Sequence, residues 1–110
     1  MSFDIVAVRK EDWVFYEEDV MLQADVLAKP WYTNQAFPHC MRVSIGMQES
    51  GFSFSVHNSK SALELSEKIR EYVIQTIDDQ GGSNQVIELK YACDWLYFWA
   101  LNDSMFLTVK

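Results

Sequence analysis

The stretch SALELSEKIREYVIQTIDD, residues 61–79, decides the fold because it carries the clearest regular pattern in the chain. Its apolar or weakly polar residues recur every three or four positions, which is the spacing of one helical face. These residues are Ala62, Leu65, Ile69, Tyr72, Val73 and Thr76. Ser61 and Glu64 fit a capping box at the start, and Gly81-Gly82 supplies a stop after the end. The pattern predicts one amphipathic helix over about residues 61–79.

The residues before this helix predict a β-hairpin. Apolar residues alternate with Ser or Gly in two runs, 43–47 and 52–56, joined by a four-residue loop. This period of two is typical of an antiparallel pair buried on one face. The expected facing pairs are Met47–Phe52, Ile45–Phe54 and Val43–Val56. We expect the helix to cover the apolar face of this hairpin.

The residues after the helix predict a second hairpin. Residues 86–101 are rich in β-branched and aromatic side chains without Gly or Pro, which favours a strand, and Asn102-Asp103 is the expected turn. One face would hold the pairs Leu96–Val109, Phe98–Leu107 and Ala100–Met105. The other would hold Tyr97, Trp99, Phe106 and Thr108. This aromatic face is either covered by the N-terminal segment or exposed as a binding patch.

The first third of the chain is the hardest to assign. Phe3–Val8 predicts a strand, and so does the alternation over Val20–Val26. Helical spacing across Trp13–Leu27 is an alternative for that region, and Lys29–Cys40 is expected to be an ordered loop. The predicted fold is a single α+β domain over residues 1–110. It has an antiparallel sheet of about five or six strands with one main helix, about residues 61–79, on one face.

Length and composition exclude several classes of protein. The chain has 110 residues, of which 49% are hydrophobic, too many for a disordered chain and enough for one core. No apolar run approaches the roughly 18 residues of a membrane span. The net charge of −7 argues against direct, sequence-independent nucleic-acid binding. The N-terminus lacks the basic start and long apolar core of a secretory signal. Together with only two cysteines, this predicts a cytoplasmic protein with reduced thiols.

The negative charge is concentrated in one stretch. Residues 11–25 contain six acids and no Lys or Arg, whereas the other 95 residues carry ten acids and nine bases. Aromatic residues lie among these acids, so the stretch could attract and then anchor a basic partner. A solvated acidic loop beside core aromatics is the alternative. The candidate partner-binding residues are Glu11, Asp12, Trp13, Tyr16, Glu17, Glu18, Asp19, Asp25, Trp31 and Tyr32.

Motifs for catalysis are missing from the sequence. There is no Gly-rich phosphate loop, Gly-x-Ser-x-Gly elbow or His-Glu-x-x-His helix. His39-Cys40, with Cys93 and His57, lacks the ligand spacing of a zinc site. Three consecutive acids, Glu17 to Asp19, point in different directions and have no basic partner nearby in sequence. We therefore predict no enzyme activity, no metal and no cofactor, and expect Cys93 to be a buried residue of a strand.

Three hypotheses follow from these observations. The first is a protein-binding inhibitor, such as an immunity protein or antitoxin that covers the basic surface of a nuclease-like toxin. This class is inferred from charge and size, without a family motif. The second is a small-ligand-binding or catalytic domain with a pocket lined by Trp95, Tyr97, Trp99 or Phe106. The third is a structural homodimer whose seam is formed by Tyr97, Trp99 and Phe106. We favour the first.

Overall fold

The computed structural model describes residues 1–15, 36–80 and 83–109. Their regular elements are β1 (Phe3–Arg9), the 3-10 helix η1 (Lys10–Phe15), β2 (Cys40–Val43), α2 (Ile45–Gln48), α3 (Ser59–Gln80), α4 (Asn84–Leu101) and β3 (Ser104–Val109). The fold is α+β, as predicted, but the antiparallel sheet has three strands among the described residues, in the order β2-β1-β3. The prediction of five or six strands is wrong. The alternation at residues 20–26 lies outside the described residues.

The sheet is built around β1, which the sequence predicts at Phe3–Val8. β1 is the central strand, and four consecutive residues of it, Ile5–Val8, are buried. Because successive side chains of a strand point to opposite faces, both faces of the sheet are covered at these residues. The Ala7 amide donates to the His39 carbonyl on the β2 side, at 2.7 Å. On the far edge of β3, the Phe106 amide donates to the His57 carbonyl at 3.0 Å. Residues 57 and 58 therefore cover the first part of the β3 edge.

Helix α3 confirms the helix predicted at residues 61–79, with a different cap. It begins at Ser59, and the Asn58 side chain accepts a hydrogen bond from the Ser61 amide at 3.0 Å. The Ser61 hydroxyl in turn accepts from the Asn58 amide at 3.1 Å. This reciprocal pair is a capping box, placed three residues earlier than the predicted Ser61–Glu64 box. The earlier start follows because Asn58, at the bridge to Met105, ends the extended segment.

Helix α4 replaces the predicted strand at residues 86–101. Ser83 caps its N-terminus by accepting a hydrogen bond from the Val86 amide, just after the Gly81-Gly82 pair. Buried side chains cover about half of its circumference, and Ile87 and Leu101 lie on the exposed side, which explains the strand-like run of apolar residues. The buried side chains are Val86, Leu89, Ala92, Cys93, Trp95, Leu96, Trp99 and Ala100. The turn at Asn102-Asp103 exists, but it connects a helix to β3. Asp103 adopts a left-handed backbone there, with φ of 50°.

The hairpin predicted over residues 43–56 is also wrong. The Ser44 hydroxyl accepts a hydrogen bond from the Met47 amide and starts the one-turn helix α2, so the strand ends at Val43. Residues 52–57 are extended and bury Phe54 and Val56, as their alternation predicts, but they belong to no regular strand. Ile45 is exposed instead of facing Phe54. A side-chain cap thus overrides the alternating pattern in the first run.

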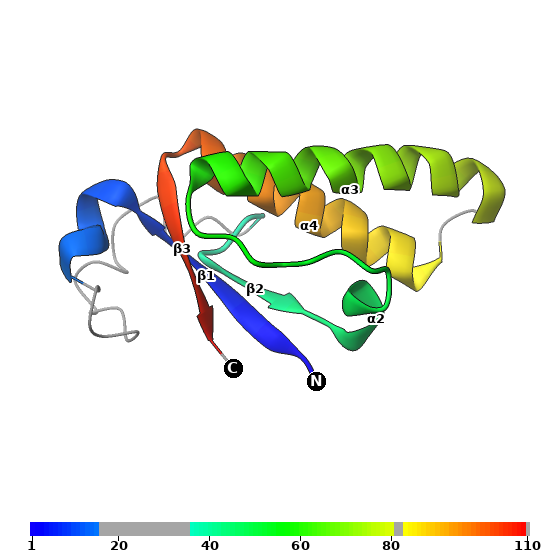
Figure 1. The fold of residues 1–110 in the computed structure, drawn as a ribbon, viewed down its shortest axis with the longest axis horizontal. Coiled ribbons are helices and arrows are strands. Elements are labelled where there is room, and N and C mark those ends of the chain that lie inside the picture. Colours follow the sequence, from blue (N-terminus) through cyan, green and yellow to red (C-terminus); the bar gives the residue numbers. More distant parts are fainter. Residues whose placement is uncertain (16–35, 81–82, 110) are drawn as a thin grey trace.

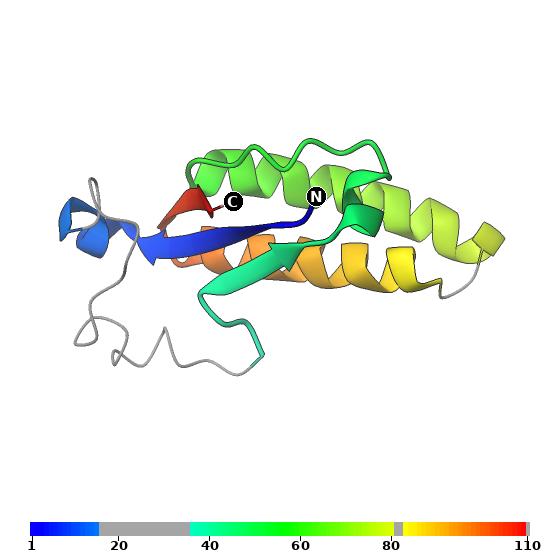
Figure 2. The same cartoon turned by 90° about the horizontal axis from the view of Figure 1, so that it is seen from below.

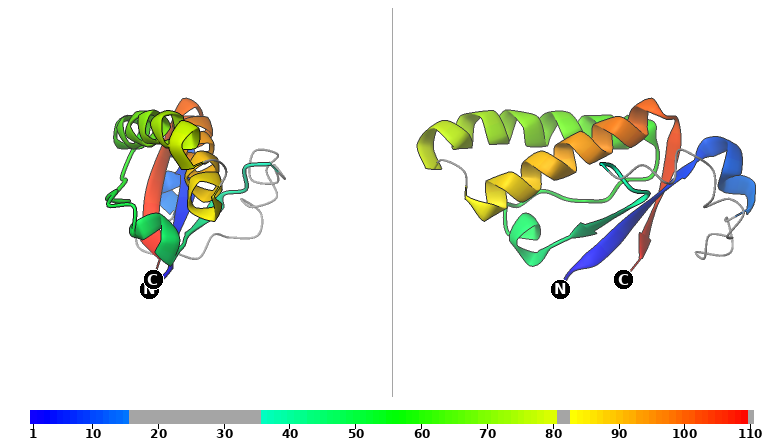
Figure 3. Two further views of the ribbon diagram at one scale, coloured as in Figure 1. Left: turned by 90° about the vertical axis from the view of Figure 1, so that its right-hand side faces the viewer. Right: turned by 180° about the vertical axis from the view of Figure 1, so that it is seen from behind.

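Two long helices cover one face of the sheet, where the sequence predicts one (Figure 1). The turned views in Figures 2 and 3 show α3 and α4 side by side and antiparallel in this layer. Phe106 of β3 meets Trp95 of α4 with ring centroids 5.9 Å apart, which places the core between the sheet and α4. Strand β1 leads into η1, which lies at one extreme of the long axis (Figure 1). The C-terminal end of α3 lies at the other extreme.

Candidate protein-binding surface

The acidic stretch begins on η1, at one end of the molecule (Figure 1). The Lys10 amide donates to the Asp103 carbonyl at 2.9 Å, which ties the start of η1 to the turn before β3. Glu11 lies on the surface, and its carboxylate pairs with the Arg9 guanidinium at 3.2 Å. Asp12 is only 1% exposed. Of these two predicted contact residues, the surface position is therefore Glu11.

Most of the predicted partner-binding residues lie outside the described part of the chain. Trp13 belongs to η1 by its backbone, but its side chain is outside the description. The other predicted residues that lie outside the described part of the chain are Tyr16, Glu17, Glu18, Asp19, Asp25, Trp31 and Tyr32. Their role as a binding surface stays a prediction.

The chain re-enters the described structure through an anchor on α4. The Pro38 carbonyl accepts two hydrogen bonds, from the indole N–H of Trp95 at 2.7 Å and from that of Trp99 at 3.1 Å. The Phe37 ring stacks on Phe98, with centroids 5.0 Å apart, and on Tyr91 at 6.2 Å. Residues 36–39 are thereby fixed to one side of α4, in the same way that η1 is fixed to β3. Both ends of the region between them are held by the folded body.

Sequence reasoning missed this anchor because it placed Trp95 and Trp99 on a strand. On a helix, residues four apart lie on one face, so both indole N–H groups can reach one carbonyl oxygen. The Trp-x-x-x-Trp spacing at 95–99 was the signal available in the sequence. It becomes informative only once residues 84–101 are assigned to a helix.

The predicted aromatic face of the last hairpin does not form. Trp99 and Phe106 are buried in the core of the chain, whereas Tyr97 is exposed on another side of α4. The homodimer seam predicted for Tyr97, Trp99 and Phe106 is therefore wrong. The aromatic pocket expected at Trp95, Tyr97, Trp99 and Phe106 is absent too, because Trp95 is also fully buried and the four side chains do not line one cavity.

The described surface carries several hollows. One, of about 280 Å³, is lined by Met1, Ser2, Phe3 and Gln48. A second, of about 390 Å³, lies between β3 and the extended segment and is lined by Phe3, Ser53, Phe54, Ser55 and Thr108. A third, of about 160 Å³, lies between the two long helices. It is lined by Arg70, Val73, Ile74, Lys90, Cys93 and Asp94.

Both cysteines are free thiols, and each is at least partly buried in the fold. Cys93 is buried, as predicted, but on a helix, where its thiol donates to the Ser66 carbonyl at 3.3 Å. Cys40 on β2 is half-buried, and burial raises the pKa of its thiol, with a smaller contribution from the nearby Asp4 carboxylate. A raised pKa keeps Cys40 protonated and a poor nucleophile at neutral pH. Among the described residues, no three His, Cys, Asp or Glu side chains are placed to hold a metal ion.

Comparisons with known proteins give no match. No protein-family model, no curated protein and no solved structure is similar to this chain. None of the helices in the described ranges combines the length and apolar content needed to cross a membrane.

Proposed function

We propose that the protein acts by binding another protein, and that residues 11–25 attract a basic partner. One observation carries this proposal: the stretch has a charge of −6, and the other 95 residues together have a charge of −1. A charge confined to one segment acts as a directed surface, because it raises the local concentration of oppositely charged partners. The aromatic residues of the same stretch are of the types that anchor protein interfaces.

The fold supports this proposal by where it holds the start of the stretch. The acids begin at η1, at one end of the long axis, and Glu11 is exposed there (Figure 1). The chain segment that contains the stretch is held by the Lys10 amide before it and by the Pro38 carbonyl after it. Restricting the ends of a segment lowers the conformational entropy that the segment loses on binding.

A concrete form of this function is an immunity protein or antitoxin. Nucleases and other enzymes acting on nucleic acid have basic surfaces because their substrates are polyanions. An acidic, aromatic segment on a small domain could cover such a surface and so inhibit the enzyme. We propose a binding role rather than catalysis, with the cytoplasm as the compartment. The two free thiols support a reducing environment.

The experiment is capture of the partner from the native host, followed by association kinetics with the purified partner. Neutralising Glu17, Glu18 and Asp19 together should slow association about tenfold at low ionic strength, because steering scales with local charge. The matched control neutralises Glu49, which follows α2, and Glu64 and Glu71 of α3; all three are exposed acids, and the net charge changes equally. Equal slowing by both variants, a partner that is not basic, or a rate independent of salt would contradict the proposal.

A further inference from the structure

Strand β3 has an outer edge, on the side away from β1, where alternate residues direct their backbone groups. The Ala7 amide of β1 points toward β2, where it donates to the His39 carbonyl, and Ala7 lies opposite Phe106 in the sheet. The backbone groups of Phe106 therefore point away from β1. Those of Ser104 and Thr108, two residues to either side, point to the same outer edge. An edge of this kind is where another extended chain can add to a sheet.

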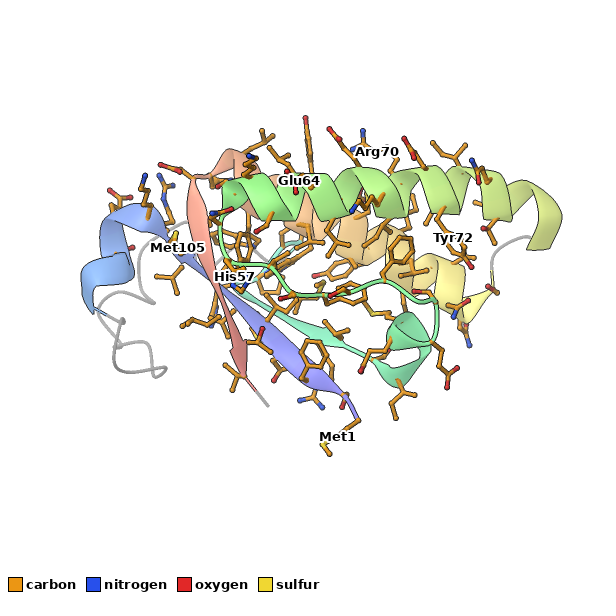
Figure 4. All side chains as sticks on the ribbon, in the orientation of Figure 1. Met1, His57, Glu64, Arg70, Tyr72 and Met105 are labelled. Carbon is orange, nitrogen blue, oxygen red and sulfur yellow. The ribbon has the colours of Figure 1, made fainter. Side chains whose placement is uncertain are left out.

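The chain itself provides acceptors for two of these three outward amides. The Ser104 amide donates to the Ser59 hydroxyl at 3.1 Å, and the Phe106 amide donates to the His57 carbonyl at 3.0 Å. Figure 4 shows His57 beside β3, where the extended segment, residues 52–57, reaches the strand. The first two outward positions of β3 are thus covered.

The third outward amide, that of Thr108, is open. Among the residues that the structure describes, none accepts a hydrogen bond from it, and Thr108 is exposed. The extended segment and β3 diverge here (Figure 1) and leave a hollow of about 390 Å³. Strands lie about 4.8 Å apart, rise about 3.3 Å per residue and occupy about 10 Å across a sheet, so the hollow has room for two to three residues of strand.

The extended segment leaves this edge open because its side chains alternate in the wrong phase. Antiparallel pairing continued from the bridge between Asn58 and Met105 would set Val56 opposite Leu107. Leu107 faces away from the helix layer, because the adjacent Phe106 side chain packs against α4. Pairing would therefore turn Val56 away from the helices.

The apolar side of the extended segment faces the helix layer instead. The Phe52 ring meets the Tyr72 ring of α3 edge to face, with centroids 5.5 Å apart. Phe54 and Val56 follow at alternate positions and are only 5% and 2% exposed. A fourth strand made from this segment would remove these side chains from the core. The position beside Thr108 is therefore left for a strand from outside.

We infer that the outer edge of β3 at Thr108 binds an extended, uncharged peptide segment of another protein. The segment exchanges two hydrogen bonds with Thr108, one to its C=O and one from its N–H, as in other strand additions. The side chain opposite Thr108 lies on the face toward the helices, where the hollow offers the rings of Phe3 and Phe54. The residues that line the hollow carry no charge, which favours an uncharged segment.

The first test is a peptide titration of the full chain, followed by NMR and amide hydrogen exchange. The probe is an acetylated and amidated pentapeptide of alternating threonine and valine. In the free chain the Thr108 amide should exchange fast and the Phe106 amide slowly, since only the latter is bonded within the chain. Peptide at about 5 mM should slow exchange at Thr108 about fivefold or more, with a Kd of about 0.1–1 mM, and leave Phe106 unchanged.

Two substitutions at position 108 separate recognition of the backbone from recognition of the side chain. Thr108→Pro removes the outward N–H and no bond to β1, as proline at a sheet edge can, and should weaken peptide binding about tenfold or more. Thr108→Val is the matched control, because it keeps the N–H and removes only the hydroxyl, and its affinity should stay within about twofold. A fully N-methylated peptide makes the same test without altering the protein and should not bind.

Several results would overturn the inference. One is slow exchange of the Thr108 amide in the free monomer, which would show that the chain already pairs this edge. Protection of the same amide in a dimer of the chain alone would assign the edge to a second copy. No saturable change up to about 5 mM peptide, or equal affinity for Thr108→Pro and the unaltered chain, would also contradict it. No basic protein enters this test, so its outcome is independent of the role proposed for residues 11–25.

Discussion

The two long helices lie in the same layer but differ in how much of their surface is buried and in which elements they contact. Helix α3 buries one narrow stripe, exposes a mostly polar face and packs against α4 and the extended segment. Helix α4 contacts β3, α2 and α3, and holds the Pro38 carbonyl on a further side. The comparison shows that α4 is the centre of the core and α3 is its cover. Four experiments can break or sharpen this comparison.

The largest effect is expected at the buried side of α4. Trp95→Ala should cost about 3–5 kcal/mol of unfolding free energy, because it leaves a cavity and removes one donor from Pro38. Tyr97→Ala, two residues along the same helix but exposed, should cost about 0.5–1 kcal/mol through its lost contact with Arg70. Urea unfolding followed by circular dichroism measures both. If Trp95→Ala does not fold, Trp95→Phe provides a milder version, and equal costs at the two positions would contradict the central role of α4.

The helix ends should show smaller and similar effects. Asn58→Ala at α3 and Ser83→Ala at α4 each remove a capping acceptor and should cost about 1 kcal/mol. This similarity is expected because a cap acts on a terminus, regardless of which face is buried. Glu64→Ala is the control for the cap of α3 and should leave the unfolding midpoint unchanged. A larger loss from Glu64→Ala than from Asn58→Ala would move the capping box back to Ser61.

The polar contact between α3 and α4 should contribute about as much to the free energy of unfolding as one helix cap. The Ser66 hydroxyl donates to the Cys93 carbonyl at 2.9 Å in a buried site. Ser66→Ala should therefore cost about 0.5–1.5 kcal/mol in thermal or chemical unfolding. Ser55→Ala, at an exposed serine of the extended segment, is the control. An unchanged stability for Ser66→Ala would mean that this hydrogen bond contributes nothing to the packing of α3 on α4.

The smallest effect is expected at the exposed side of α4. Lys90 and Asp94 form a surface ion pair at 3.2 Å with helical i, i+4 spacing. Lys90→Ala should cost about 0.3–0.5 kcal/mol at low salt and less as salt is raised. Unfolding of dilute protein at two salt concentrations measures it. A cost above that of Ser66→Ala would show that the exposed side of α4 contributes more to folding than its contact with α3.

The same contrast explains what could be predicted from the sequence. Residues 61–79 show helical spacing because one side of α3 meets water, and Ile5–Val8 is a short apolar run typical of a central strand. Residues 86–101 show no such period, because α4 is buried on several sides and carries Ile87 and Leu101 on the side that remains. Their length, 16 residues, exceeds the usual strand and was the available argument for a helix.

The candidate site was predictable in its charge and not in its supports. Counting acids locates the stretch at residues 11–25 without any structure. Sequence cannot show that Asp12 is buried while its neighbour Glu11 is exposed, since a 3-10 turn places adjacent side chains on different sides. Nor can it show the anchor at Pro38. This anchor depends on contacts with Trp95 and Trp99, which are separated from Pro38 by 57 and 61 positions in the chain.

The central position of β1 has a consequence for how the protein folds. Asp4 pairs with Val109, so residues 105 positions apart must meet before the sheet is complete. Local elements such as α3 can form early, whereas pairing at this separation is entropically slow. The chain is synthesised at about 5–20 residues per second, so β1 has no β3 to pair with until the last part of the chain has been made. Until then the β1 edge that will receive β3 is open, and a chaperone that shields strand edges has its clearest substrate in that interval.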